Sequence, residues 1–163
     1  MTPRTTTLTR AAGIGAVAGL AAGSAMVLTE KVEQALTRRP DSFVPARALL
    51  TALGRRPSEA SKPTSWNHVM HYLTAAALGA LRGVWSAVGI RGAYANVWHC
   101  AVRLAFDQTV ENTTGAGAPP HTWPARELAV DVIHKFVFSL VTGIITDRVI
   151  RPRAASARGR TSH

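Results

Sequence analysis

The chain has 163 residues, enough for one domain, and 47% of them are apolar. Its formal charge is +10, from 19 Lys and Arg residues against 9 Asp and Glu residues, which points to nucleic acid or to an anionic membrane surface as a partner. No helix-turn-helix or zinc-finger spacing accompanies the basic stretches, so nucleic-acid binding is not expected. The single cysteine, Cys100, excludes an intramolecular disulfide framework and a cysteine-based zinc site.

The first apolar segment covers residues 11–28 and has charged residues on both sides. Its 18 residues are at the short end of the range that crosses a bilayer as a helix. Gly15, Gly19 and Gly23 recur every four residues on one helix face, which predicts close packing against another helix in lipid. A secretory signal peptide is the alternative, because a basic start and an apolar run followed by small residues also fit a cleaved leader.

Three further apolar segments follow, separated by polar loops. Residues 30–64 contain four prolines and predict a long polar loop, with a short helix over residues 45–53. Helices are expected over residues 11–33, 66–90, 93–110 and 126–148, so that residues 1–148 form a single helical membrane domain. The basic residues 149–163 are expected to be a disordered tail.

Polar residues fall on single faces of these predicted helices. On the last helix, apolar side chains surround most of the circumference and leave a narrow polar strip. That pattern is typical of a helix that faces lipid on most sides and a polar interior on one. The side chains predicted to face this interior are His71, Arg82, His99, Arg103, Glu127, Asp131, His134 and Lys135.

These features predict an all-α fold, a small transmembrane bundle of about four helices in a cell membrane. The lipid bilayer is its expected partner, together with a second copy or another membrane protein. Residues 93–106 are too short to span a bilayer unaided, so the third helix is expected to be tilted, extended or partly interfacial. Lys and Arg residues number eight on each side of such a bundle, so their distribution does not predict its orientation.

The acids and bases on the polar strips predict mutual pairing, and Asp131 precedes Lys135 at the favourable helical spacing. A structural or accessory role, with an internally paired polar stripe, is the leading functional prediction. A small transporter or proton-linked channel is the first alternative, because ionisable residues inside a membrane are functional candidates. A metal- or haem-binding bundle is the second: Asp131 and His134 form one carboxylate-x-x-His unit, and His71 with His99 or His134 suits haem.

No cofactor and no enzyme activity are expected, because the sequence has no phosphate-binding loop, nucleophile elbow or long acidic metal cluster.

The order of features over residues 11–148 resembles the YagU-like family of small bacterial inner-membrane proteins. The resemblance rests on a Gly/Ala-rich first helix and on a second helix that carries His71 and a Gly79-x-x-x-Gly83 step. It continues with a third helix that has an internal histidine, a Pro/Gly loop, and a last helix with Glu127 and His134. The resemblance implies a four-helix membrane fold, helix packing through Gly79 and Gly83, and no particular biochemical activity.

Overall fold

The computed structural model describes residues 3–152, and its regular structure is entirely helical. The elements are α1 (Pro3–Thr37), α2 (Val44–Ala52), α3 (Thr64–Ala87), α4 (Gly92–Thr113), the short 3-10 helix η1 (Pro120–Thr122) and α5 (Ala125–Val149). No strand occurs within residues 3–152, which confirms the all-α prediction. Most of the tail that was expected to be disordered lies outside the described residues.

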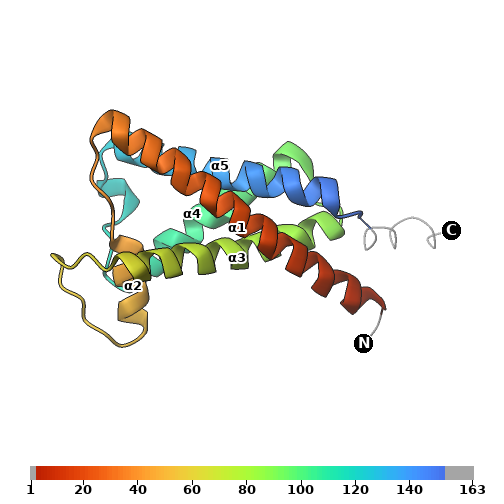
Figure 1. The fold of residues 1–163 in the computed structure, drawn as a ribbon, viewed down its shortest axis with the longest axis horizontal. Coiled ribbons are helices and arrows are strands. Elements are labelled where there is room, and N and C mark those ends of the chain that lie inside the picture. The colour runs from red at the N-terminus through yellow and green to blue at the C-terminus, as the bar shows by residue number, and fades with distance from the viewer. Residues whose placement is uncertain (1–2, 153–163) are drawn as a thin grey trace.

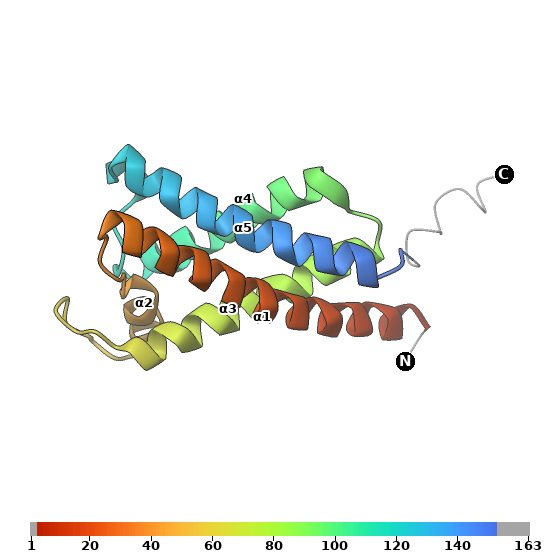
Figure 2. The same ribbon diagram turned by 45° about the horizontal axis from the view of Figure 1, so that its top comes forward.

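The four long helices follow the long axis of the molecule (Figures 1 and 2). The start of α1, the α3–α4 turn and the end of α5 lie at one end, called here the turn end. The short helix α2 lies at the opposite end, the α2 end. Helix α1 packs along α3 and α5, and α4 packs along α5. Helices α3 and α4 contact each other little, and α2 packs against both of them.

The backbones of α1 and α3 touch through glycines. A Cβ atom on Gly15 would collide with the carbonyl oxygen of Gly79 and lie 2.8 Å from the Cα of Gly83. A Cβ on Gly19 would lie 2.8 Å from the Cα of Gly79, whereas the nearest atoms to one on Gly23 are side-chain atoms, first the Cβ of Ala75 at 3.0 Å. Four of the five glycines predicted to pack helices therefore lie in a backbone-to-backbone contact, which is the geometry that small-xxx-small faces allow.

Helix α1 is longer than expected at both ends, since residues 11–33 were predicted and Pro3–Thr37 is observed. The added turns are mostly polar, so hydropathy does not detect them, although Leu8 packs against the cluster of Ala11, Ala87 and Ile150. The Thr9 hydroxyl donates to the Thr5 carbonyl at 3.0 Å, and the Thr37 hydroxyl to the Glu33 carboxylate at 2.7 Å. The helix ends at Arg38, which has a φ of 57°.

The predicted bounds of the other helices differ from the observed ones by up to three residues. Helix α3 was predicted over residues 66–90; it starts two residues earlier and ends three residues earlier. The early end is set by Gly89, which adopts a φ of 92°. The Ile90 amide donates to the Trp85 carbonyl at 2.9 Å across that glycine, a Schellman ending that prevents further helix. Helix α4 continues to Thr113 and ends in the same way at Gly115, which has a φ of 68°.

The interior of the bundle contains many polar side chains, whereas many large apolar side chains lie on its surface. The largest fully buried side chains are Arg82, Phe138, His99, Thr142, Thr146, Ser86 and Ser139. A small apolar cluster of Ala22, Met26, Ala75, Leu78 and Phe138 completes the centre. Large apolar side chains such as Leu73, Trp98 and Ile133 are more than half exposed. Two helices, α1 from Thr5 and α5, are long and apolar enough to cross a membrane.

Candidate functional site

The first polar cluster lies near the turn end and is called here the Arg82 network. Arg82 of α3 is fully buried and forms a two-pronged ion pair with Asp147 of α5, at 3.0 and 2.9 Å. Ser86 donates to the same carboxylate at 2.7 Å, and the backbone amide of Gly92 donates to it at 2.9 Å. Arg82 also donates to the Asn96 side chain at 3.1 Å. The network therefore ties α3, α4 and α5 together.

Arg91 and Gly143 close this end of the bundle. Arg91 donates to the Ile150 carbonyl at 2.7 Å and to the backbone carbonyl of Asp147. A Cβ on Gly143 would collide with the Asn96 side chain, so α4 and α5 are in close contact there. Among the described atoms of Arg82, only Nε lacks a hydrogen-bond partner. The turn end is thus packed and largely satisfied.

A second group of polar residues lies in the middle of the bundle. The ring of His99 is fully buried and stacks on Phe138, with centroids 5.5 Å apart, and its Nε2 lies 3.0 Å from the Leu78 carbonyl. The guanidinium of Arg103 lies over the same Phe138 ring, 4.9 Å from its centroid. His99 is therefore part of the packing between α3, α4 and α5.

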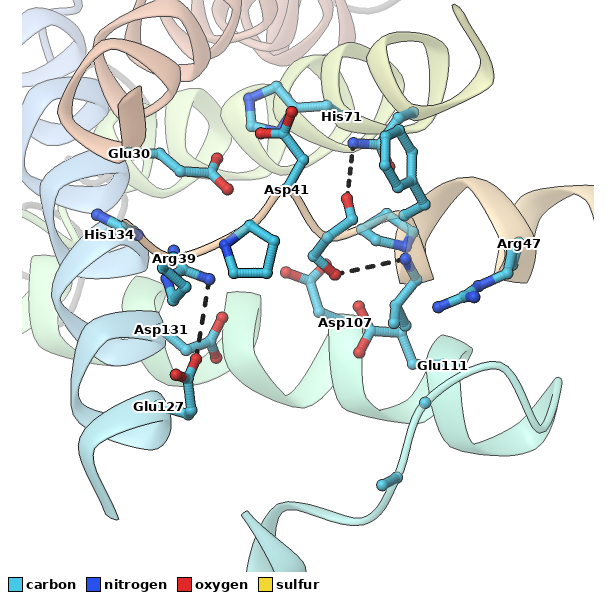
Figure 3. A pocket seen from close by; sticks show the side chains of 18 of the residues that line it. Glu30, Arg39, Asp41, Arg47, His71, Asp107, Glu111, Glu127, Asp131 and His134 are labelled. Atoms are coloured by element: carbon cyan, nitrogen blue, oxygen red, sulfur yellow. Dashed lines mark hydrogen bonds and ion pairs between the residues drawn. The ribbon is translucent and has the colours of Figure 1, made fainter. Parts of the chain in front are cut away.

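The third feature is a charged pocket of about 910 Å³ at the α2 end, lined by residues from all five α-helices and from the loops between them. In Figure 3, Glu127, Asp131 and His134 of α5 lie on one side of this space, and Arg47 and Glu111 lie on the opposite side. Seven of the nine acidic residues of the sequence line it: Glu30, Asp41, Glu59, Asp107, Glu111, Glu127 and Asp131. Five basic residues line it as well: Arg39, Arg47, Lys62, Arg103 and Lys135.

Four of these charges form a continuous chain on the wall of the pocket. Arg103 Nε donates to Asp107 Oδ2 at 2.9 Å, and the Lys135 ammonium lies 3.5 Å from the same oxygen. Lys135 also pairs with Asp131 four residues earlier in α5, as the spacing predicts. Arg103 and Lys135 are almost completely buried, so their charges depend on these carboxylates for stabilisation.

The rim of the pocket carries more exposed pairs. Arg39 lies 2.9 Å from Glu33 and 3.8 Å from Glu127, and Arg47 donates to the Glu59 carbonyl at 2.6 Å. A hydrogen bond from Lys31 lowers the pKa of Asp41. These contacts connect the loop that follows α1 to α1 and α5, and α2 to the loop that follows it.

Glu111 lies on the pocket wall beyond the apolar part of α4, which ends at Phe106. Burial raises the pKa of Glu111 to about 7. Glu111 forms no ion pair with another described residue. Gly117 packs close to it, because a Cβ at Gly117 would lie 3.1 Å from the Glu111 carboxylate. Its carboxyl group therefore changes charge close to neutral pH.

The eight residues predicted to face a polar interior are distributed over these three features. Arg82 lies in the Arg82 network and His99 in the middle of the bundle. The other six, His71, Arg103, Glu127, Asp131, His134 and Lys135, line the charged pocket. Glu127 is 45% exposed and therefore lies at the rim, not in the interior where it was expected. The cause is its position in the first turn of α5, at the open end of the pocket.

Sequence reasoning missed Asp147, Glu111 and Arg39 as members of these clusters. Asp147 follows the apolar run of α5 and seemed to belong to the polar flank. The sequence did contain a signal that Asp147 faces the interior. The buried small residues Ser139 and Gly143 are four residues apart on one face of α5, and Asp147 lies one turn after Gly143 on that face. Arg39 could not be recognised from local spacing, because Glu127, one of its two partners, is far from it in the sequence.

The histidines considered as haem or metal ligands do not converge. His71 and His134 line the pocket, whereas His99 lies outside it. His71 Nε2 lies 3.2 Å from the Gly23 carbonyl, and His99 Nε2 contacts the Leu78 carbonyl. Within the described residues, no three His, Cys, Asp or Glu side chains are grouped in a way that would hold a metal ion.

Comparison of the chain with protein-family models, curated proteins and solved structures gives no match. The resemblance to the YagU-like family therefore stays a prediction from the sequence.

Proposed function

We propose that the chain is a multi-pass integral membrane protein with a structural or accessory role, and that α1, α3, α4 and α5 cross the bilayer. The observation that carries the proposal is the inverted distribution of polarity. Arg82 is the largest fully buried side chain, while twenty large apolar side chains are exposed. In water this arrangement would leave much apolar surface uncovered, whereas in lipid it satisfies both the surface and the interior.

The length of α1 between its charged flanks supports the same proposal. Nineteen residues separate Arg10 from Glu30, which corresponds to roughly 28 Å of helix. The hydrocarbon core of a bilayer is about 30 Å thick. The Arg82 network and the charged pocket then lie towards opposite faces of the membrane.

In this role the paired charges hold the bundle together. Inside lipid, helices gain little from apolar contact with each other, so close backbone packing and polar contacts between helices stabilise the assembly. The glycine contact joins α1 to α3, the Arg82 network joins α3, α4 and α5, and the Arg103–Asp107–Lys135–Asp131 chain joins α4 to α5. Every long helix is thereby tied to a neighbour.

Cysteine accessibility in intact cells and in inverted vesicles tests the four-span arrangement. In a Cys100→Ser background, single cysteines replace Ser58 in the loop before α3 and Ile90 in the α3–α4 turn, both exposed. Four spans place these positions on opposite sides of the membrane, so a membrane-impermeant maleimide should label them from opposite sides. Labelling of both positions from the same side would leave only α1 and α5 as spans. Carbonate extraction tests the membrane location itself, which release of the protein into the soluble fraction would overturn.

A small transporter or proton-linked channel is the second candidate, favoured by the charged pocket. The pocket lies at the α2 end, while the turn end is closed by the Arg82 network and by the contact of Gly143 with Asn96. A pocket closed on one side is one of the two states that alternating access requires. Proteoliposomes that show no flux of protons or small solutes at any pH between 5 and 8 would contradict this candidate.

A further inference from the structure

The charged pocket offers charges of both signs to a ligand. Seven acidic and five basic side chains line it. A simple anion would lie close to carboxylates, and a simple cation would lie close to the buried Arg103 and Lys135. Neither kind of ion is therefore matched by the whole pocket.

Three buried atoms of residues that line the pocket lack hydrogen-bond partners in the described chain: Arg47 Nε, Arg103 Nη1 and Asp131 Oδ2. The Arg103 residue is only 4% exposed, and its single ion pair, with Asp107, uses Nε and leaves Nη1 free. The Asp131 carboxylate pairs with Lys135 through Oδ1 and leaves Oδ2 free. An unmet donor and an unmet acceptor in a buried position are each costly, by about 1–3 kcal/mol.

Two of these three atoms, Arg103 Nη1 and Asp131 Oδ2, belong to the two ends of one chain of charges. Arg103 begins it, Asp107 and Lys135 follow, and Asp131 ends it. The inner pairs satisfy each other, so the terminal groups are the ones left to bind something else. A ligand that meets both must carry an anionic acceptor and a cationic donor separated by a spacer.

The size and remaining lining of the pocket suit a small organic molecule. A volume of about 910 Å³ falls within the range of pockets that bind such ligands. Met26, Phe43, Val44 and Trp123 provide apolar surface beside the charges. Methylene groups between two charged ends would contact that surface.

We infer that the charged pocket binds a small zwitterion of the amino-acid type, with its carboxylate on Arg103 and its ammonium group on Asp131. Solvent does not reach either terminal atom, so the ligand contacts them by moving a neighbouring side chain aside. The inference goes beyond the structural role proposed above and does not depend on it, because it concerns only the pocket. It applies equally whether two or four helices cross the membrane.

Binding to the purified full chain in detergent tests this inference with three probes of equal length. They are 4-aminobutyrate, which carries both charges, butylamine, which carries only the cation, and butyrate, which carries only the anion. Isothermal titration calorimetry should give a dissociation constant for 4-aminobutyrate about tenfold or more lower than for either single-charge probe. Equal binding of all three, or stronger binding of one single-charge probe, would overturn the inference.

The distance between the two charged groups of the ligand provides a second, independent readout. Because Arg103 and Asp131 are separated by two intervening charged residues, glycine should bind more weakly than 4-aminobutyrate or 6-aminohexanoate. An optimum within this series is expected. Absence of measurable binding at every length would also overturn the inference.

Variants assign each end of the ligand to its residue. Arg103→Gln should lower the affinity for 4-aminobutyrate to that for butylamine, and Asp131→Asn should lower it to that for butyrate. Arg103→Lys keeps the charge but loses the planar guanidinium, and provides the same test if Arg103→Gln does not fold. Arg126→Gln is the matched control, since Arg126 is exposed, lies on α5 and does not line the pocket. Unchanged affinity in Arg103→Lys and Asp131→Asn would overturn the assignment.

Discussion

The two ends of the bundle contain similar chemistry, basic side chains paired with aspartates, but they differ in closure. At the turn end, Arg82 and Asp147 share two hydrogen bonds and are enclosed by Ser86, Asn96 and a backbone amide. At the α2 end, the Arg103–Asp107–Lys135–Asp131 chain borders a space of about 910 Å³. Similar ion pairs therefore produce a closed network at one end and an open pocket at the other.

The lengths of the connections explain the difference. Helices α3 and α4 are joined by residues 88–91 alone, which holds their ends together at the turn end. The connection between α1 and α3 covers residues 38–63, and that between α4 and α5 covers residues 114–124. Small residues such as Gly143 let the helices approach at the turn end, whereas α2 fills only part of the space between α3 and α4. The remaining space is the charged pocket.

The largest effect on stability is expected from Asp147→Ala at the turn end. The substitution leaves the fully buried Arg82 without its carboxylate, and an unpaired buried charge costs about 3–5 kcal/mol. Thermal unfolding of the detergent-solubilised protein should show this as a large fall in Tm. A double variant, Arg82→Met with Asp147→Ala, should recover much of the loss, because no buried charge remains. A double variant less stable than Asp147→Ala would contradict this explanation.

The next largest effect is expected from Gly79→Ala, which tests the glycine contact between α1 and α3. The new Cβ would lie 2.6 Å from the Gly19 Cα and would collide with the Gly15 carbonyl, so the two helices must separate. Overpacking of this kind costs about 1–3 kcal/mol.

Gly13→Ala on α1, the helix that α3 meets in this contact, is the matched control. Nothing lies within 4 Å of a Cβ at Gly13, so the substitution should stabilise α1 by up to about 1 kcal/mol. A fall in Tm of equal size in both variants would indicate that the glycines matter for backbone flexibility and not for packing.

Much of this fold follows from local patterns in the sequence. The apolar segments predict the four long helices, and the prolines and glycines between them predict the loops. The periodic glycines Gly15, Gly19, Gly79 and Gly83 mark the faces through which α1 and α3 meet, although nothing in either helix alone states that the two faces pair. The extension Thr5–Thr9 of α1 is not detected by hydropathy, because Leu8 is the single apolar residue within it.

The candidate sites were less accessible from the sequence because their partners are distant along the chain. Arg82 was recognised as an interior residue by its helical face, but Asp147, its partner 65 residues later, was not. Periodicity reports the face of one helix and contains no information on the depth at which two helices meet. For the same reason, Glu127 was expected in the interior although its side chain is 45% exposed at the rim of the pocket.

A smaller effect is expected from the pH dependence of stability at the α2 end. Burial raises the pKa of Glu111 to about 7, above its ordinary value of 4.5. Between these two values the folded chain holds a proton that the unfolded chain has released, so stability falls as the pH rises from about 4.5 to 7. Glu111→Gln should remove this part of the dependence. Unfolding curves of the two proteins at pH 5 and pH 8 measure it, and an unchanged slope in the variant would exclude Glu111 as its origin.

The smallest effect is expected from Asp41→Ala, which provides the contrast to Asp147→Ala. Asp41 pairs with Lys31, and both side chains are more than half exposed to solvent. Such pairs contribute about 0–1 kcal/mol, since water already solvates both charges and salt screens them. The difference in Tm between Asp41→Ala and the parent protein should therefore be small in low salt and vanish in high salt. A loss comparable to that of Asp147→Ala would mean that the rim of the pocket is closed in solution, and the contrast between the two ends would then disappear.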